Sequence, residues 1–271
     1  MGRLSASQLR QEISARNLAR GRDFAHELSA GFVPSVIYDK AEGGGHGNFL
    51  ASSYARIVLN PSWRRRLKKA YTASRFVPRA GDRQRYELEC ASSSDALLMN
   101  VFCYPGVTRN LGLCGLLGIE RGVEPEFGIR ARTPLGNGLT DRTEIDMRLG
   151  SLLVEAKLTE GDFQRAPLRR LAQYRDAEHV FDFARLPIHE GVVYGWQLIR
   201  GVLAAHARSA SFAVLCDARR PDLIESWFRI VSTVTSCSLR TRLGLVTWQE
   251  IAVHVPLRIR RFLAEKYGIE G

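Results

Sequence analysis

Two carboxylates and a lysine lie on either side of one predicted tight turn. Gly150-Ser151 is typical of a two-residue type II′ β-turn, which joins antiparallel strands. Pairing across this turn places Asp146 opposite Glu155, and Lys157 follows Glu155 on the same face. Directly opposed side chains in a β-hairpin have Cβ atoms about 5 Å apart. The spacing therefore predicts a hairpin that brings these three charged side chains together.

The same hairpin has one apolar and one charged face. Glu144 falls opposite Lys157 on the charged face. Charged faces are usually solvated, and this second pair could be an ordinary cross-strand ion pair. Two acids in direct opposition, however, cost stability unless a cation lies between them, and a divalent metal ion with oxygen ligands fills that role. The predicted apolar face carries Ile145, Met147, Leu149, Leu152, Val154 and Ala156.

The pattern of Asp146 followed by Glu155-Ala156-Lys157 on the next strand resembles the PD-(D/E)XK nuclease superfamily, the fold of many restriction endonucleases. Ile145 stands where the motif has its proline. Residues 92–100 and 215–224 are also similar to a bacterial branch of restriction-endonuclease-like proteins. The resemblance covers roughly residues 88 to 255.

The resemblance implies a Mg²⁺ or Mn²⁺ ion held by Asp146, Glu155 and the backbone carbonyl of Ala156. Such an ion neutralises charge that builds on phosphorus and assists the leaving oxygen. Lys157 would orient the attacking water and offset charge on the phosphoryl group. The expected catalytic residues are therefore Asp146, Glu155 and Lys157.

Three further residues are candidates for a supporting role around this site. Glu144 shares the charged face and either tunes Lys157 or forms a simple salt bridge. Glu126 precedes the first predicted strand and either supplies another acid or is surface-exposed. Gln173 lies on the helix predicted after the hairpin, where some branches of the superfamily place a glutamine that contacts substrate.

The balance of charge favours a polyanionic partner. The 271-residue chain has a net charge of +11 and a pI near 9.8, and nucleic acid, with DNA favoured, is the commonest such partner. Asn60-Pro61 is a cap and first residue for a helix rich in cations, and further cations lie on the helix predicted at 168–180. A solvated helix face explains these cations about equally well. The candidate phosphate contacts are Arg64, Arg65, Arg66, Lys68, Lys69, Arg169 and Arg170.

The composition is that of a cytoplasmic globular protein. Hydrophobic residues make up 45% of the chain, no apolar run is long enough to span a membrane, and the N-terminus has no apolar signal core. The five cysteines form no Cys-x-x-Cys pair and are expected to be reduced and buried. We therefore expect no membrane association.

The order of predicted elements indicates an α/β (α+β) fold of the restriction-endonuclease type. An αβββαβ core gives a mixed central sheet flanked by helices. An N-terminal basic helical region at 1–85, ending in a polar linker at 78–85, precedes a nuclease-like domain at 86–271. The predicted core elements are a helix at 92–102, strands at 127–133, 140–149 and 151–158, a helix at 192–207 and a strand at 211–216. Further helices are predicted at 4–29, from residue 60 to 71, and at 108–117, 168–180, 221–234 and 257–267, with a capping box at 247–250.

These observations together predict a metal-dependent nuclease that hydrolyses phosphodiester bonds, an endonuclease rather than an exonuclease, of either restriction or repair type. A homodimer is compatible with this expectation. Two alternatives stay open. The protein could bind nucleic acid without cutting it, or its basic surface could dock an acidic protein partner.

Overall fold

A five-stranded mixed sheet lies at the centre of the computed structural model, which describes residues 2–21, 24–29, 34–40, 44–70 and 85–271. The strand order is β12-β11-β7-β6-β3. Strands β3, β6 and β7 pair antiparallel, whereas β7, β11 and β12 pair parallel. The bounds are β3 (Glu126–Arg130), β6 (Glu144–Leu149), β7 (Leu152–Ala156), β11 (Ser211–Cys216) and β12 (Leu243–Thr247).

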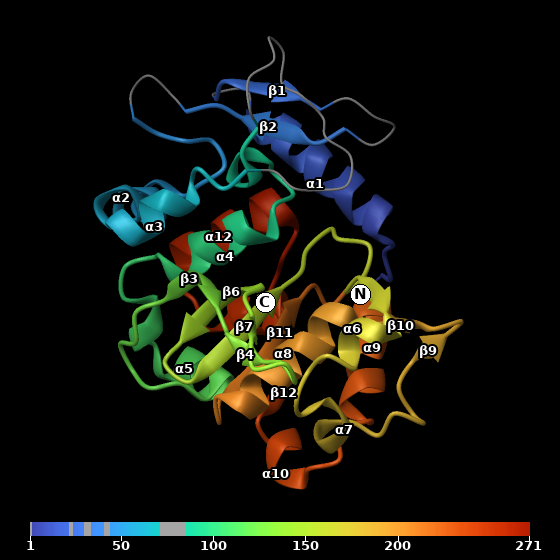
Figure 1. Cartoon of the computed structure of the whole chain (residues 1–271). Coiled ribbons are helices and arrows are strands. Elements are labelled where there is room, and N and C mark those ends of the chain that lie inside the picture. The colour runs from blue at the N-terminus through green and yellow to red at the C-terminus, as the bar shows by residue number, and fades with distance from the viewer. Residues whose placement is uncertain (1, 22–23, 30–33, 41–43, 71–84) are drawn as a thin grey trace.

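The predicted αβββαβ order is confirmed. Helix α4 (Ser94–Phe102) precedes the three antiparallel strands, and α8 (Trp196–Ala207) crosses over from β7 to the parallel strand β11 (Figure 1). The side chain of Ser93 caps α4, because it accepts a hydrogen bond from the Ala96 amide. The structure thus has the predicted α+β fold of the restriction-endonuclease-like class.

Each face of the sheet is covered by its own apolar layer. One layer comes mainly from α8 and α9 (Pro221–Val231), and the other from α4, α11 (Trp248–Val253), α12 (Leu257–Tyr267) and α1 (Ala6–Arg20). Helix α8 approaches β11 closely because Gly201 has no side chain, and a Cβ there would lie 2.1 Å from the Phe212 ring. Burial on both faces makes the sheet the rigid centre of the molecule.

The predicted hairpin register is confirmed next to the turn. Leu149 pairs with Leu152 and Met147 with Val154, and Gly150 has the positive φ, 58°, that the first turn position requires. The expectation of a wholly charged second face is wrong, because Leu153 on that face is buried against the α8 layer. Strand β7 is therefore buried on both sides, and its one charged residue, Glu155, is enclosed by protein.

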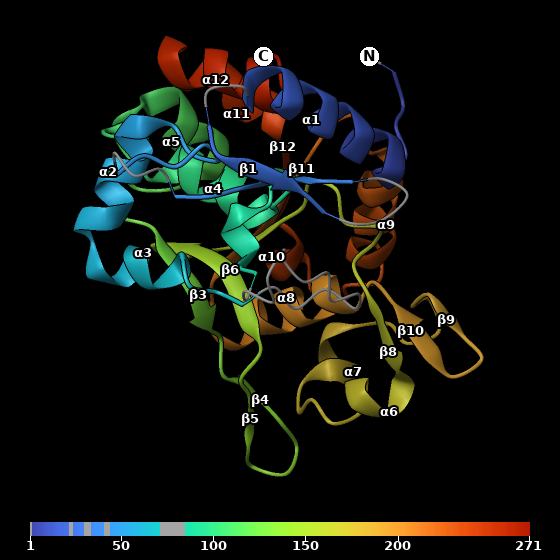
Figure 2. The ribbon, with the colours of Figure 1, turned by 90° about the horizontal axis from the view of Figure 1, so that it is seen from above.

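The N-terminal region wraps around the core (Figure 2). Helix α1 begins after a capping box at Ser5 but ends at Arg20, because strand β1 (His26–Leu28) follows and pairs with β2 (Val36–Tyr38). The predicted helix to residue 29 is thus too long. Asn60 and Pro61 start α3 (Pro61–Arg66) as predicted, after α2 (Ala51–Leu59). These two helices cover α4 from outside, so that all nine residues of α4 are buried.

Two predicted helices are shorter in the structure. The helix expected at 168–180 is divided into α6 (Leu168–Leu171) and α7 (Ala177–Val180), because the chain between them pairs with β4 (Thr133–Pro134). The helix expected from 192 starts at Trp196, because 192–194 form strand β10 (Val192–Tyr194). Gly195, in a left-handed conformation with a φ of 74°, separates the strand from the helix.

Short elements complete the chain. Residues 71 and 78–84, which belong to the predicted second helix and the predicted linker, lie outside the described residues. Within the described ranges no helix is long and apolar enough to span a bilayer. The remaining elements are α5 (Leu111–Leu117), α10 (Cys237–Arg240), β5 (Thr140–Asp141), β8 (Arg165–Pro167), β9 (Ile188–His189) and the 3-10 turns Glu87–Glu89 and Val107–Arg109.

Candidate active site

Asp146, Glu155 and Lys157 lie together where β6 and β7 run side by side. The Lys157 ammonium donates to Glu155 Oε1 at 2.6 Å, and the Ala156 amide donates to Asp146 Oδ2 at 2.9 Å. Both backbone polar groups of Lys157 form hydrogen bonds. Its amide donates to the Leu215 carbonyl on β11, and its carbonyl accepts from the Trp248 indole at 2.9 Å. The structure therefore brings together Asp146 on β6, Glu155 on β7 and Lys157 directly after β7.

Burial and like charge act together on Asp146. Burial raises the pKa of Asp146 well above its usual range, and the nearby carboxylates of Glu155 and Asp95 raise it further. Burial alone would lower the pKa of Lys157, but the surrounding carboxylates, Glu155 foremost, outweigh it and hold that pKa above its ordinary value. Lys157 thus stays charged. The repulsion among the carboxylates acts mainly on Asp146, whose pKa is raised.

Asp95, which the sequence did not single out, contributes a third carboxylate to this neighbourhood. It begins α4 and is buried, with Arg66 Nη2 at 3.0 Å and Lys69 Nζ at 2.6 Å from its Oδ2. Burial raises the pKa of Asp95, but these two cations outweigh burial and lower it. Asp95 is therefore a paired, ionised group. The signal in the sequence was only an acid in the first turn of a capped helix.

Gln197 is a second site residue that sequence reasoning missed. It lies in the first turn of α8, and its side-chain amide donates to Glu155 Oε1 at 2.8 Å. The Gln197 Oε1 atom is buried without a hydrogen-bond partner. No local pattern marks this residue, because 42 positions separate it from Glu155 and only the crossover between β7 and β11 brings them together.

The three predicted supporting residues lie apart from the acid pair. Glu144 does not meet Lys157. Instead its carboxylate pairs with Arg66 at 2.7 Å and Lys69 at 3.2 Å, because the regular hairpin ladder ends at Met147.

The other two supporting residues are exposed. Glu126 pairs with Arg148 at the opposite end of the β3–β6 ladder. Gln173 lies in the turn between α6 and α7, where its backbone carbonyl accepts from the Gly136 amide. These positions place neither residue in hydrogen-bond contact with the acid pair.

The predicted phosphate contacts divide into two groups. Arg66, only 8% exposed, and Lys69 bind Asp95 and Glu144, so their charge is neutralised inside the protein. Gly128 makes this possible, because a Cβ there would lie 2.3 Å from Arg66 Nη1. Exposed cations that keep their charge toward solvent are Arg64, Arg65, Lys68, Arg169 and Arg170.

The chemistry of the acid pair suits a hard cation. Asp146 and Glu155 offer carboxylate oxygens and Ala156 a backbone carbonyl, the ligand types that Mg²⁺ prefers. The repulsion that raises the Asp146 pKa is what a divalent ion would relieve. Among the described residues no group of three or more histidine, cysteine or acidic side chains is placed so that it could hold a metal ion.

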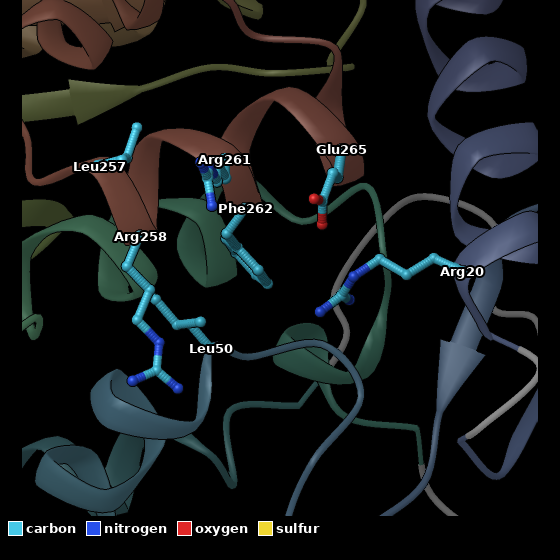
Figure 3. Close-up of a pocket in the computed structure, with 7 residues that line it drawn as sticks. All are labelled: Arg20, Leu50, Leu257, Arg258, Arg261, Phe262 and Glu265. Atoms are coloured by element: carbon cyan, nitrogen blue, oxygen red, sulfur yellow. The ribbon is translucent and has the colours of Figure 1, made fainter.

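A groove of about 460 Å³ lies elsewhere on the surface, between α12, the end of α1 and the start of α2 (Figure 3). Arg20, Arg258 and Arg261 line the groove together with Phe262, and the Arg20 guanidinium stacks over the Phe262 ring, 4.9 Å from its centroid. None of the predicted site residues lines this groove. The candidate active site is therefore the acid pair on the sheet and not this groove.

The mixed sheet, the αβββαβ order and the acid pair beside a buried lysine define a protein of the restriction-endonuclease-like class. The model of the family described as restriction endonuclease associating with ARP matches residues 25–268. The chain belongs to this family, and membership suggests a nuclease of the restriction type. No protein of curated function and no solved structure matches the chain.

Proposed function

We propose that the protein is a metal-dependent endonuclease with a PD-(D/E)XK-type site, acting on DNA. The observation that carries this proposal is the convergence of Asp146 on β6 with Glu155 and Lys157 at the end of β7, where Glu155 and Lys157 are buried. Repulsion between two neighbouring carboxylates inside a protein lowers its stability. Arrangements of this kind are typical of functional sites, where the chemistry requires both acids. Membership of a restriction-endonuclease family supports the same reaction and DNA as the substrate.

Asp146 and Glu155, with the Ala156 carbonyl, would hold Mg²⁺ or Mn²⁺. When bound, this ion supplies charge neutralisation at the phosphoryl group and at the leaving oxygen. Lys157 would orient the attacking water and contribute positive charge beside the phosphate. Lys157 now donates to Glu155, so the lysine is held in place by the same carboxylate that would bind the ion.

Substrate positioning falls to the exposed cations. Arg64, Arg65 and Lys68 project from the outer helix α3 region, and Arg169 and Arg170 from α6. Each neutralised phosphate contributes affinity independently of base sequence. The family description names an association with ARP, and we include that association in this proposal.

The test is incubation of the purified chain with single- and double-stranded DNA and RNA, with Mg²⁺ or Mn²⁺ and with excess chelator. Cleavage that needs the divalent ion and is lost in Asp146→Asn supports the proposal. Cleavage that persists in chelator contradicts it. Binding to DNA with no cleavage under any metal condition supports the alternative, a nucleic-acid-binding protein that has kept the fold without the chemistry.

A further inference from the structure

A two-stranded hairpin, β4 and β5, projects from the end of the central sheet (Figure 2). It joins β3 to β6, the strand that carries Asp146. The tip, residues 136–140, is exposed throughout, and Leu139 is 65% exposed. None of these tip side chains packs into the core, so all of them are accessible to a binding partner.

A neighbouring segment holds this hairpin at its base and at Gly136, the first residue of the tip. The Gly136 amide donates to the Gln173 carbonyl at 2.8 Å, and Leu135 forms a β-bridge with Tyr174. The Tyr174 hydroxyl also donates to the Asp141 carboxylate on β5. These contacts extend the hairpin pairing to a third segment, so its direction is fixed relative to the core.

The same contacts connect the hairpin to the acid pair. The Tyr174 ring packs edge-on against Trp196, with 5.9 Å between ring centroids. Trp196 is the neighbour of Gln197, whose amide binds Glu155. A chain of contacts through Tyr174 and Trp196 therefore links the hairpin to Gln197, which binds the acid pair.

Backbone strain occurs where the hairpin leaves the sheet. Arg132 has a φ of 54°, a left-handed conformation that costs a non-glycine residue roughly 1 kcal/mol. The residue before it, Ala131, is buried in the core, and its carbonyl accepts from Arg208. This sharp change of direction aims the hairpin outward, and strain of this kind is typical of functional segments.

The hairpin region is positively charged. Arg130, Arg132 and Arg142 are exposed, and no carboxylate among the described residues lies within ion-pair distance of them. The one acid of the hairpin, Asp141, is occupied by hydrogen bonds from Thr143 and Tyr174, which help to lower its pKa against the opposing effect of burial. Among the described residues, the hairpin thus offers three cations without an ion-pair partner near a tip that exposes Leu139.

We propose that the β4–β5 hairpin enters the major groove of double-stranded DNA beside the bond that the acid pair hydrolyses. Arg130, Arg132 and Arg142 bind the flanking phosphates, and Leu139 contacts base edges. The inference rests on the proposed function and names duplex DNA as its substrate. A two-stranded ribbon fits a major groove about 12 Å wide, whereas the major groove of duplex RNA is too narrow.

The test measures binding separately from cleavage. In an Asp146→Asn background, fluorescence anisotropy compares duplex DNA, the same single strand and duplex RNA. Changing Arg130, Arg132 and Arg142 together to Ala should weaken duplex DNA binding and flatten its salt slope by about 3. Leu139→Ser should weaken duplex DNA binding about tenfold and leave single-strand binding unchanged.

A matched control removes three exposed arginines away from the hairpin, Arg121, Arg229 and Arg240. This control should keep most of the duplex affinity and the salt slope. Equal losses in the two triple variants, equal losses for single strands and duplexes, or no duplex binding by the Asp146→Asn parent would each overturn the inference. If the unmutated chain never cleaves while the hairpin variants selectively lose duplex binding, the groove inference stands and the nuclease proposal fails.

Discussion

Lys157 and Glu155 form an ion pair of 2.6 Å with both side chains about 5% exposed. Glu155 lies on β7 and Lys157 follows it by two residues, directly after the strand ends, so the two side chains fall on the same face. Because the pair is enclosed, Glu155 is compensated inside the protein, whereas among the described residues Asp146 accepts its hydrogen bond from the backbone amide of Ala156. The two acids are therefore electrostatically unequal before any ion binds.

Asp146→Asn should abolish cleavage and preserve the fold, because it removes the charge and keeps the shape. Burial and like charge already raise the pKa of Asp146, so removing its charge should leave thermal stability equal or higher. DNA binding should be at least as strong, since one repulsive charge near phosphate is gone. Gel cleavage, thermal unfolding and anisotropy check the three statements, and full cleavage by this variant would remove the nuclease proposal.

Lys157→Ala should lose cleavage but retain metal binding, because the lysine acts on water and is not a ligand. The structure adds a cost: Glu155 would be left buried without its cation, which typically destabilises by about 3–5 kcal/mol. Calorimetric titration with Mn²⁺ below the lowered melting temperature is the measurement. Loss of metal binding in a folded variant would contradict this assignment.

Arg64→Ala with Arg65→Ala should weaken DNA binding without affecting stability, because both side chains are exposed. Each lost phosphate contact flattens the salt slope by about 1. Arg66→Ala should instead destabilise the fold by about 3–5 kcal/mol, because it leaves the buried Asp95 with one cation fewer. Urea unfolding and anisotropy on both variants separate the two roles, and a stable Arg66→Ala variant with weak binding would reverse our assignment.

Gln197→Ala should reduce metal affinity and cleavage by about 10- to 100-fold, because residues that orient a metal ligand contribute on this scale. Gln197→Glu should be worse than Ala, since it sets another carboxylate against Glu155. Metal affinity measured by calorimetry is the decisive readout, because a purely structural role would lower the melting temperature and leave that affinity intact.

Glu87 should make stability depend on pH. Burial and the neighbouring carboxylate of Asp95 raise the pKa of Glu87 to about 7 from an unfolded value of 4.5. The folded chain then binds more protons than the unfolded chain between these values, so this group's contribution to stability falls as pH rises from about 4.5 to about 7. Glu87→Gln should remove that fall. Identical pH profiles for the two proteins would show that Glu87 titrates normally.

The local signals in the sequence predicted well where short-range chemistry decides structure. The turn at Gly150-Ser151, the Asn60-Pro61 start of α3 and the capping box of α11 are all confirmed. Strand β12 was not predicted, because Leu243–Thr247 is a short apolar run that becomes a strand only by pairing with β11. The boundary at residue 85 and the possible homodimer stay predictions.

Tertiary contacts decided the rest. The periodicity at 168–180 favoured one helix, but pairing with the projecting hairpin outweighed helix propensity there. Arg66 looked equivalent to Arg64 and Arg65, since nothing in the sequence shows that Asp95 and Glu144 lie beneath it. Long-range partners of this kind cannot be read from spacing along the chain.

The passage of Arg66 over Gly128 has a consequence for truncated proteins. The N-terminal segment that carries Arg66 and Lys69 provides the counter-ions of an acid beside the candidate active site. A fragment starting after residue 85 would therefore not be a minimal nuclease with a DNA-binding arm removed. It would contain Asp95 stripped of both cations next to two further carboxylates, and its failure to cut DNA would report a charge imbalance and not a lost contact with substrate.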